Sequence, residues 1–379
     1  MFNNQSCWTL VDVSFMVNYA CHATFVKYKD AYSEVCGPEF DPIDMIDSFE
    51  TEMLAYFEHQ IPEAIAIHCP IVAREKIIYC YDCPRSEIWR KDIFDGYKGA
   101  RDKKPRKFDM KPIHAVVDKW INLQCENYKS QIARVDRCEG DDLLYHFTNR
   151  ILNETVDSVI NISGDFDICT LLGDRVRQVH PDGTDLSLEL MYEKLEKKHK
   201  MQIEFPKTAE NFLHFKILTG DSSDSIPSVK PRKMGPKTAP KYIADLEMLG
   251  ALLKEEVDVL NAYKRNTMLI KMKCVPVEIT ESIKKATSQI VLGEPPIEDI
   301  DSIKANLMSD VVLVDNESIK EVMKKSSIEY KAITPNEIVV NVGAQLTEVL
   351  ETEQPVLDIN EQDLNEVDLD ALLKDVLGE

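Results

Sequence analysis

The chain has 379 residues, of which 44% are hydrophobic, and it carries a formal net charge of −21 at pH 7. This length allows two domains, or one large α/β domain with an appendage, and the apolar content allows a sizeable core. No run approaches the roughly eighteen apolar residues of a membrane span, and the N-terminus lacks the basic region and cleavage site of a signal peptide. We therefore expect a cytoplasmic protein with no membrane contact.

The ten cysteines are scattered singly, apart from the pair Cys80 and Cys83, which is typical of a reducing compartment. The pair could be half of a zinc knuckle or a redox centre. No second CxxC or HxxxH motif accompanies it, so neither interpretation is favoured.

The negative charge is distributed unevenly. Residues 294–379 contain 21 acidic and 6 basic residues, a net of −15, which leaves −6 for residues 1–293. Residues 85–111 hold ten Lys and Arg against five Asp and Glu, and residues 230–241 hold five basic residues with no acid. Positive patches on a body with acidic pockets favour a polyanionic partner such as nucleic acid.

Four apolar, β-rich segments each end in or lead to carboxylates. They are 7–15 with Asp12, 75–84 with Asp82, 131–136 with Glu139, Asp141 and Asp142, and 158–163 with Asp165 and Asp167. Alternation of these strands with helical segments predicts a mostly parallel sheet flanked by helices. Because ligands bind at the carboxyl edge of such a sheet, we expect all seven carboxylates on one rim.

Helical spacing of apolar residues predicts helices at 41–60, 113–128, 139–151 and 188–199, and a short apolar segment lies at 63–68. From about residue 206 the pattern is helical, interrupted by a turn with Gly220, Asp221 and Asp224 and by a basic loop, and it ends in a helix at 251–273. Carboxylates dominate past Pro295, which we take as a domain boundary.

Aromatic residues are interleaved with the cations of residues 85–111, namely Trp89, Phe94, Tyr97 and Phe108. A charge run is most often a solvated face. Aromatic rings among cations, directly after a strand-end Asp, favour instead the stacking and phosphate contacts by which single strands are held.

Nine carboxylates thus occur in the strand-end and turn motifs, and no histidine accompanies them there. Each acid alone could cap a helix or shape a turn. Together they form an all-oxygen set that prefers Mg²⁺ or Mn²⁺ to zinc. So dense a set fits two hydrated ions about 4 Å apart, an arrangement used to hydrolyse phosphodiesters.

The motifs follow one another as the strand-end Asp12, IIYCYD, WRKDIFDGYKGAR, CEGDDLL, SGDFDICTLL, GDSSDSIPSV, MGPKTA and AYKRNTMLI. Over residues 7–275 they resemble the flap endonuclease and 5′-nuclease family, most closely its ribonuclease H branch from T-even bacteriophages. The resemblance implies a PIN-like α/β catalytic domain at 1–205 with a helical arch at about 86–112. It also implies a helical duplex-binding subdomain with a helix–three-turn–helix element at 206–293. An acidic extension at 294–345 and a disordered acidic tail at 346–379 would follow.

The resemblance implies a role for each motif. The first metal site would be held by Asp12, Asp82, Glu139, Asp141 and Asp142, and the second by Asp165, Asp167, Asp221 and Asp224. Lys98 and Arg101 would neutralise the scissile phosphate at the base of the arch, and Tyr97 would stack on a base near the cut.

Implied DNA contacts are Arg90 in the arch and Lys230, Arg232, Lys233, Gly235, Lys237 and Thr238 in the duplex-binding element. That element often binds K⁺ in the family. Here the KPRK segment lengthens its loop by about two residues and adds phosphate contacts that increase the salt dependence of binding. Duplex binding could therefore depend more on these cations than on K⁺.

We therefore expect a monomeric, Mg²⁺-dependent 5′-nuclease, with Mn²⁺ as a substitute, acting in the cytoplasm of a phage-infected bacterium. It would cleave branched or nicked DNA and RNA–DNA hybrids and remove RNA primers and flaps during replication. The alternatives are a PIN-type nuclease of single-stranded RNA and a non-catalytic, structure-specific DNA-binding protein. The acidic C-terminal region is either a solvating tail or a docking segment for a sliding clamp or single-strand-binding protein.

Overall fold

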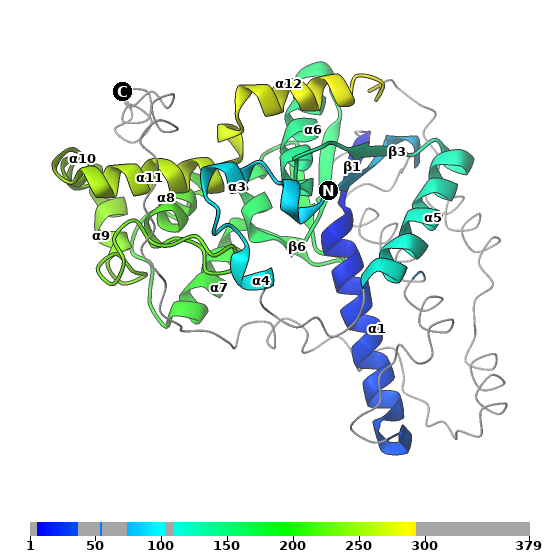
Figure 1. The fold of residues 1–379 in the computed structure, drawn as a ribbon, viewed down its shortest axis with the longest axis horizontal. Coiled ribbons are helices and arrows are strands. Elements are labelled where there is room, and N and C mark those ends of the chain that lie inside the picture. Colours follow the sequence, from blue (N-terminus) through cyan, green and yellow to red (C-terminus); the bar gives the residue numbers. More distant parts are fainter. Residues whose placement is uncertain (1–5, 37–53, 55–73, 103–109, 293–379) are drawn as a thin grey trace.

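The computed structural model describes residues 6–36, 54, 74–102 and 110–292 (Figure 1). The predictions for residues 41–60 and 63–68, for the boundary at Pro295, and for the acidic segments 294–345 and 346–379 lie outside these ranges, except for helical Leu54. None of the helices in the described ranges is both long and apolar enough to cross a lipid bilayer.

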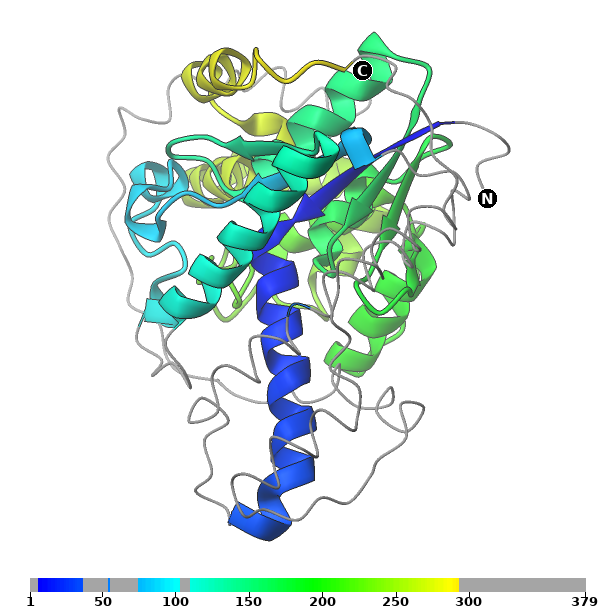
Figure 2. The same cartoon turned by 90° about the vertical axis from the view of Figure 1, so that its right-hand side faces the viewer.

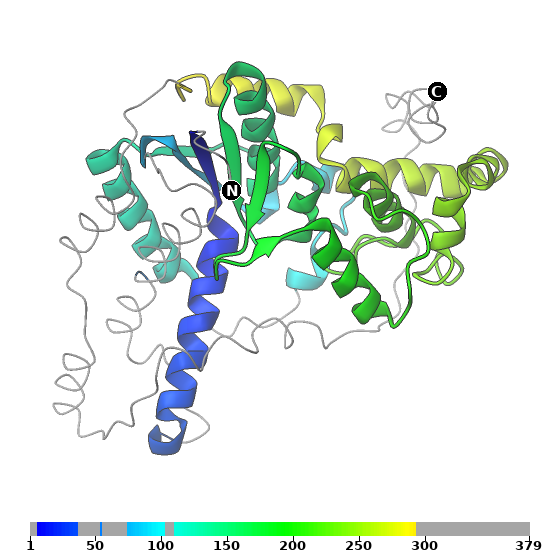
Figure 3. The same cartoon turned by 180° about the vertical axis from the view of Figure 1, so that it is seen from behind.

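A six-stranded sheet forms the centre, in the order β3-β2-β1-β4-β5-β6. Its strands are β1 (Cys7–Asp12), β2 (Ile77–Tyr81), β3 (Gln131–Arg134), β4 (Ser158–Ile162), β5 (Val176–Val179) and β6 (Asp185–Leu186). All neighbouring pairs are parallel except β5 and β6. This confirms the mostly parallel sheet, while β5 and β6 at its edge, seen from behind in Figure 3, were not predicted.

Helices cover both faces of the sheet. On one face, α6 (Gly140–Glu154) packs Leu143, Phe147 and Ile151 against Trp8 and Leu10 of β1, and α12 (Val277–Ala286) adds to the same apolar cluster. The other face carries α5 (Met110–Tyr128) and the first turns of α1 (Val13–Cys36), and α1 then continues away from the sheet (Figure 2). The central strands are buried on both faces, which explains their continuous apolar sequences.

The strand predicted at 7–15 ends earlier, at Asp12, and α1 begins at Val13. The Asp12 side chain accepts a hydrogen bond from the backbone N–H of Phe15 at 2.9 Å, as a helix-capping carboxylate does. Val13, Met16 and Val17 are buried at helical spacing. The apolar run therefore spans the end of a strand and the start of a helix, and the prediction of a strand to residue 15 was wrong.

The region from residue 188 to residue 274 is helical, and most of it packs around a second apolar cluster. Its helices are α7 (Leu188–His199), α8 (Ala209–Thr219), α9 (Ala239–Ala244), α10 (Leu246–Glu255) and α11 (Val257–Ile270), with the short 3₁₀ helix η5 (Met272–Cys274). The prediction of one helix at 251–273 was wrong. Glu256 has extended backbone angles, φ −118° and ψ 96°, and separates α10 from α11.

Candidate active site

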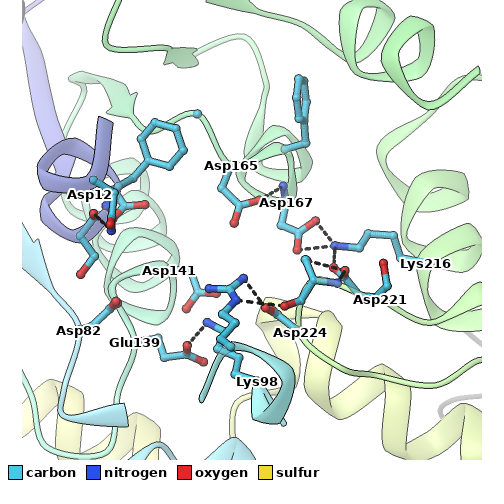
Figure 4. Close-up of a pocket in the computed structure, with 18 of the residues that line it drawn as sticks. Asp12, Asp82, Lys98, Glu139, Asp141, Asp165, Asp167, Lys216, Asp221 and Asp224 are labelled. Carbon is cyan, nitrogen blue, oxygen red and sulfur yellow. Dashed lines mark hydrogen bonds and ion pairs between the residues drawn. The ribbon is translucent and has the colours of Figure 1, made fainter. Parts of the chain in front are cut away.

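A cavity of about 1350 Å³ opens at the carboxyl edge of the sheet (Figure 4). Eight of the nine predicted carboxylates line it: Asp12, Asp82, Glu139, Asp141, Asp165, Asp167, Asp221 and Asp224. Lys98 and Arg101 line it as well. The structure thus brings together residues from the ends of strands, the start of a helix and a distant turn.

The first group of acids is fixed by the ends of β1 and β2 and by the start of α6. Asp12 accepts a hydrogen bond from the Ser163 hydroxyl at 2.9 Å in addition to the bond from Phe15. Asp82 accepts a hydrogen bond from the backbone N–H of Gly140 at 2.6 Å. Backbone and hydroxyl donors therefore hold these two carboxylates at the rim of the sheet.

The second group lies on the short 3₁₀ helix η4 (Phe166–Leu171), which follows β4, and on the turn after α8. Asp165 caps η4 by accepting a hydrogen bond from the backbone N–H of Asp167 at 2.9 Å. A Cβ atom at Gly164 would lie 2.2 Å from the Phe15 ring. Glycine at this position therefore lets the chain pass close to α1 before it presents Asp165.

Lys216 joins this second group, and sequence reasoning missed it. Its ammonium lies 2.6 Å from both carboxylate oxygens of Asp167 and 2.6 Å from Asp221 Oδ2 (Figure 4). Burial acts to lower the pKa of Lys216, but the two aspartates raise it well above its ordinary value. The available signal was one cation within the apolar helix FLHFKIL, just before the Gly-Asp turn.

Glu139 is surrounded by donors from the predicted arch. It accepts hydrogen bonds from the Arg90 guanidinium at 2.8 Å, from the Tyr97 hydroxyl at 2.9 Å, and from the Lys98 ammonium. Although burial opposes the shift, Lys98 and Arg90 lower the pKa of Glu139 to about 2. Glu139 is therefore a charged carboxylate with cationic partners.

Arg90 and Tyr97 are each only 2% exposed. The Arg90 guanidinium is too buried to make the predicted DNA contact. The Tyr97 ring is likewise too buried to stack on a base. Both side chains instead support Glu139 from inside the protein.

Asp142 lies outside the cavity and is fully buried. It accepts hydrogen bonds from Arg90 at 2.8 Å, from the Trp89 indole at 3.0 Å, and from the backbone N–H of Glu139 at 3.0 Å. The last bond completes a capping box at the start of α6. The structure thus separates Asp142 from the eight carboxylates of the cavity and gives it the partners of a structural residue.

The predicted duplex contacts lie together on residues 230–238, before α9. Arg232, Lys233 and Lys237 are exposed, whereas Gly235 and Thr238 are half-buried. Lys230 forms an ion pair with Glu256 at the N-terminal end of α11. The segment thus presents several cations to solvent.

Histidines also line the cavity, at positions 22, 114 and 199. They project from α1, α5 and α7, helices that do not contain the acidic motifs, and sequence reasoning did not identify them. In the described part of the chain, no group of three or more His, Cys, Asp or Glu side chains is placed to hold a metal ion as it stands.

The electrostatics of the cavity nevertheless suit added positive charge. Burial, together with Asp82 and Asp165, raises the pKa of Asp12 to about 7, and burial with neighbouring acids raises that of Asp167 to about 7. Burial also raises the pKa of Asp141 well above its usual range, and Oδ1 of this side chain is buried without a hydrogen-bond partner. Oxygen donors that are not fully satisfied by the protein fit a hard divalent cation.

A parallel sheet thus carries at its carboxyl edge an acidic, lysine-containing cavity, which suits divalent cations and a phosphate group. The chain belongs to the 5′-3′ exonuclease family by its N-terminal resolvase-like domain, whose family model matches residues 10–202, just over half of the sequence. The family resemblance expected from the motifs is therefore confirmed.

Curated relatives include the thermostable DNA polymerase I of Thermus aquaticus, 27% identical over 200 residues, which are 52% of this chain and 21% of the polymerase. DNA polymerase I of Caldicellulosiruptor bescii is 26% identical over 209 residues, 55% of this chain and 22% of the polymerase. The chain thus spans only about a fifth of the length of these relatives.

Among solved structures, the bacteriophage T5 D15 flap endonuclease in complex with DNA and metal ions has 17% sequence identity and a TM-score of 0.48. The match covers 80% of this chain and 98% of that protein. The T5 5′-exonuclease with bound zinc gives 18% identity and a TM-score of 0.47, with the same coverage.

Proposed function

We propose that the protein is a divalent-cation-dependent 5′-nuclease acting on branched or nicked DNA and RNA–DNA hybrids. It would hydrolyse phosphodiesters near 5′ ends and so remove RNA primers and flaps during replication. The observation that carries this proposal is the meeting of eight carboxylates from five chain segments in one cavity that also contains lysine and arginine. Family membership supports the same reaction class.

Two groups of acids would hold the cations. One comprises Asp12, Asp82, Glu139 and Asp141, and the other Asp165, Asp167, Asp221 and Asp224. Such all-oxygen sets suit Mg²⁺ and Mn²⁺. When bound between carboxylates and a phosphodiester, cations of this kind lower the pKa of water and offset charge on the leaving oxygen.

The cationic side chains of this chain would bind the substrate phosphate. Lys98 and Arg101, in the basic segment 85–111, line the cavity, and Figure 4 shows Lys98 across it from Asp165 and Asp167. Fixed positive charge in a partly buried cavity stabilises the negative charge that develops on a phosphate during hydrolysis. We assign this role to Lys98 first, because its side chain is 14% exposed and already held among the carboxylates.

The region from α8 to α9 would bind the downstream duplex as a helix–three-turn–helix element. Its exposed cations at 232, 233 and 237 support this proposal because phosphate contacts by such side chains are independent of sequence. A K⁺ ion at the backbone of this loop is a further part of the proposal.

The test is cleavage of a 5′-flap DNA substrate with and without Mg²⁺. We expect Mg²⁺-dependent cleavage near the junction, which Asp165→Asn abolishes while flap binding remains within about twofold, since no DNA-contacting cation is removed. Asp174→Asn, at an exposed acid on the loop before β5, is the matched control and should cleave normally. Wild-type turnover by Asp165→Asn would exclude the assignment of the cation site.

The nucleic acid that the protein cleaves or binds distinguishes the proposed 5′-nuclease from the two alternative functions. Cleavage of single-stranded RNA without any junction would identify a PIN-type single-strand nuclease. Tight flap binding without cleavage in Mg²⁺ or Mn²⁺ would identify a non-catalytic DNA-binding protein.

A further inference from the structure

Residues 97–101, which belong to the basic segment 85–111, are held against the turn formed by residues 222–225. The backbone N–H of Lys98 donates to the Asp224 carbonyl at 2.7 Å. The Arg101 guanidinium donates to the Ser223 carbonyl at 3.0 Å and pairs with Asp224 Oδ1 at 2.6 Å. Two segments more than a hundred residues apart are thus joined beside the cavity.

A further bond in this junction comes from a side chain with no assigned role. The Ser225 hydroxyl accepts a hydrogen bond from the backbone N–H of Ala100 at 3.0 Å. Ala100 lies in the first turn of the short helix α4 (Gly99–Asp102), where helix N–H groups have no partner within the helix. Ser225 therefore supplies, from a distant part of the chain, the acceptor that a capping side chain normally provides locally.

Two residues of the junction have left-handed backbone conformations. Lys98 has φ 56° and Ser225 has φ 63°. Non-glycine residues rarely adopt this conformation, and they keep it where surrounding contacts enforce it. The left-handed backbone of Lys98 directs its side chain to Glu139 on the cavity wall (Figure 4).

We propose that Ser225 is a positioning residue for Lys98. Its hydroxyl fixes the first turn of α4, and the fixed turn holds the adjacent Lys98 in the left-handed conformation that keeps its ammonium among the carboxylates. This inference rests on the proposed function for the catalytic part played by Lys98. The contact itself is independent of that function.

Three variants test the contact. Ser225→Ala removes the acceptor but keeps a side chain at the left-handed position. Ser225→Asn restores a side-chain oxygen, and asparagine tolerates this backbone conformation better than most residues. Ser282→Ala is the control, because that exposed hydroxyl donates to the Glu278 carbonyl of its own helix, α12, which does not belong to the junction.

The first readout is hydrogen–deuterium exchange of the full-length protein, followed on peptides that contain residues 97–102. We expect Ser225→Ala to speed exchange of this segment by about tenfold, the effect of one lost hydrogen bond, and Ser225→Asn to restore it. Unchanged exchange in Ser225→Ala would overturn the proposal, whatever the activity of the protein.

The second readout is single-turnover cleavage of the 5′-flap substrate, with flap affinity measured separately. Ser225→Ala should cleave about tenfold more slowly than wild type, because Lys98 is no longer held in place, while its affinity for the flap stays within about twofold of wild type. Ser225→Asn should recover most of the rate, and Ser282→Ala should match wild type. Equal rate losses in Ser225→Ala and Ser225→Asn, or a loss confined to affinity, would show that Ser225 is merely structural.

The two proposals fail in different ways. If the wild-type protein does not cleave the flap, the proposed function is wrong, and the exchange experiment still decides the contact. If wild type cleaves and Ser225→Ala cleaves equally fast, the function stands and the positioning role is wrong.

Discussion

Two lysines act as internal counter-ions for the acidic cavity. Lys216 bridges Asp167 and Asp221, and Lys98 pairs with Glu139. Carboxylates gathered in a partly buried cavity repel one another and lose hydration, so a nearby ammonium stabilises the folded protein. An added divalent cation at the second group would compete with Lys216 for the same oxygens.

We expect Lys216→Met to lower the free energy of unfolding of the metal-free protein by on the order of 3 kcal/mol, because two partly buried carboxylates lose their cation. The same variant should bind Mg²⁺ more tightly than wild type, because no ammonium competes. Urea denaturation in EDTA and isothermal titration with Mg²⁺ measure the two effects. Lys254→Met, at an exposed lysine on α10, is the control.

A decrease in Mg²⁺ affinity in Lys216→Met would contradict the competition. It would mean that Lys216 organises the carboxylates for the ion instead of occupying its place.

The raised pKa of Asp12, about 7, predicts a pH-dependent loss of stability in the metal-free protein. Because the folded state holds this proton more tightly than the unfolded chain, stability falls as pH rises from about 4 to about 7. Asp12→Asn removes this loss and keeps an acceptor that can cap α1. The variant should therefore gain stability over wild type across this window, by on the order of 2 kcal/mol at its upper end.

Urea denaturation in EDTA at several pH values measures that difference. Other groups titrate in the same window, such as His146, whose burial lowers its pKa to about 4. Those that do not interact with Asp12, His146 among them, are common to both proteins and leave the difference unchanged. A difference that is constant from pH 4 to pH 7 would show that Asp12 is not protonated in the folded protein near neutral pH.

At the scale of elements, turns and helix ends present the functional side chains. Gly220 ends α8 with φ 73° and ψ −176°, a conformation that is essentially restricted to glycine. A Cβ atom there would lie 2.3 Å from the Ile226 carbonyl oxygen. The next residue is Asp221, so the turn that carries the cavity acids Asp221 and Asp224 depends on this glycine.

Gly220→Ala should therefore lower the free energy of unfolding by about 3 kcal/mol, from backbone strain and the contact with Ile226. Gly173→Ala is the control, because a Cβ atom at that exposed glycine meets nothing within 4 Å. Chemical denaturation of both variants measures the effect. Equal stability of the two variants would show that the turn can rearrange without cost.

At the scale of the whole molecule, the cavity connects the sheet to the helical region at residues 188–274. Asp12 and Asp82, at the ends of β1 and β2, lie across the cavity from Asp167 on η4 and Asp221 on the turn after α8 (Figure 4). Helix α4 packs against that turn. A cation bound to acids of both regions would therefore stabilise the folded protein.

We expect Mg²⁺ at a hundredfold excess over its dissociation constant to raise the melting temperature of the full chain by on the order of 5 °C. NaCl at the same ionic strength should not, because screening does not replace coordination by carboxylates. Differential scanning fluorimetry makes the comparison, and Asp165→Asn should reduce the Mg²⁺ shift while Asp174→Asn keeps it. Equal shifts with Mg²⁺ and NaCl would argue against a specific cation site.

The sequence by itself determined the parallel sheet and the acids at its rim. Apolar β-rich segments ending in carboxylates are local patterns, and the rule that parallel strands share a carboxyl edge brings Asp12, Asp82 and Asp165 together without knowledge of packing. The family motifs added the likeness that the match over residues 10–202 confirms.

Only the tertiary structure decided which polar side chains face the cavity and which are buried beneath it. Arg90 and Asp142 belong to motifs that predicted a DNA contact and a metal ligand, yet they pair in the interior across 52 positions of sequence. Lys216 belongs to no acidic motif, yet it reaches Asp167 across 49 positions. Residue type sets the charge of a side chain, but the packing of distant segments decides whether that charge meets solvent, substrate or a buried partner.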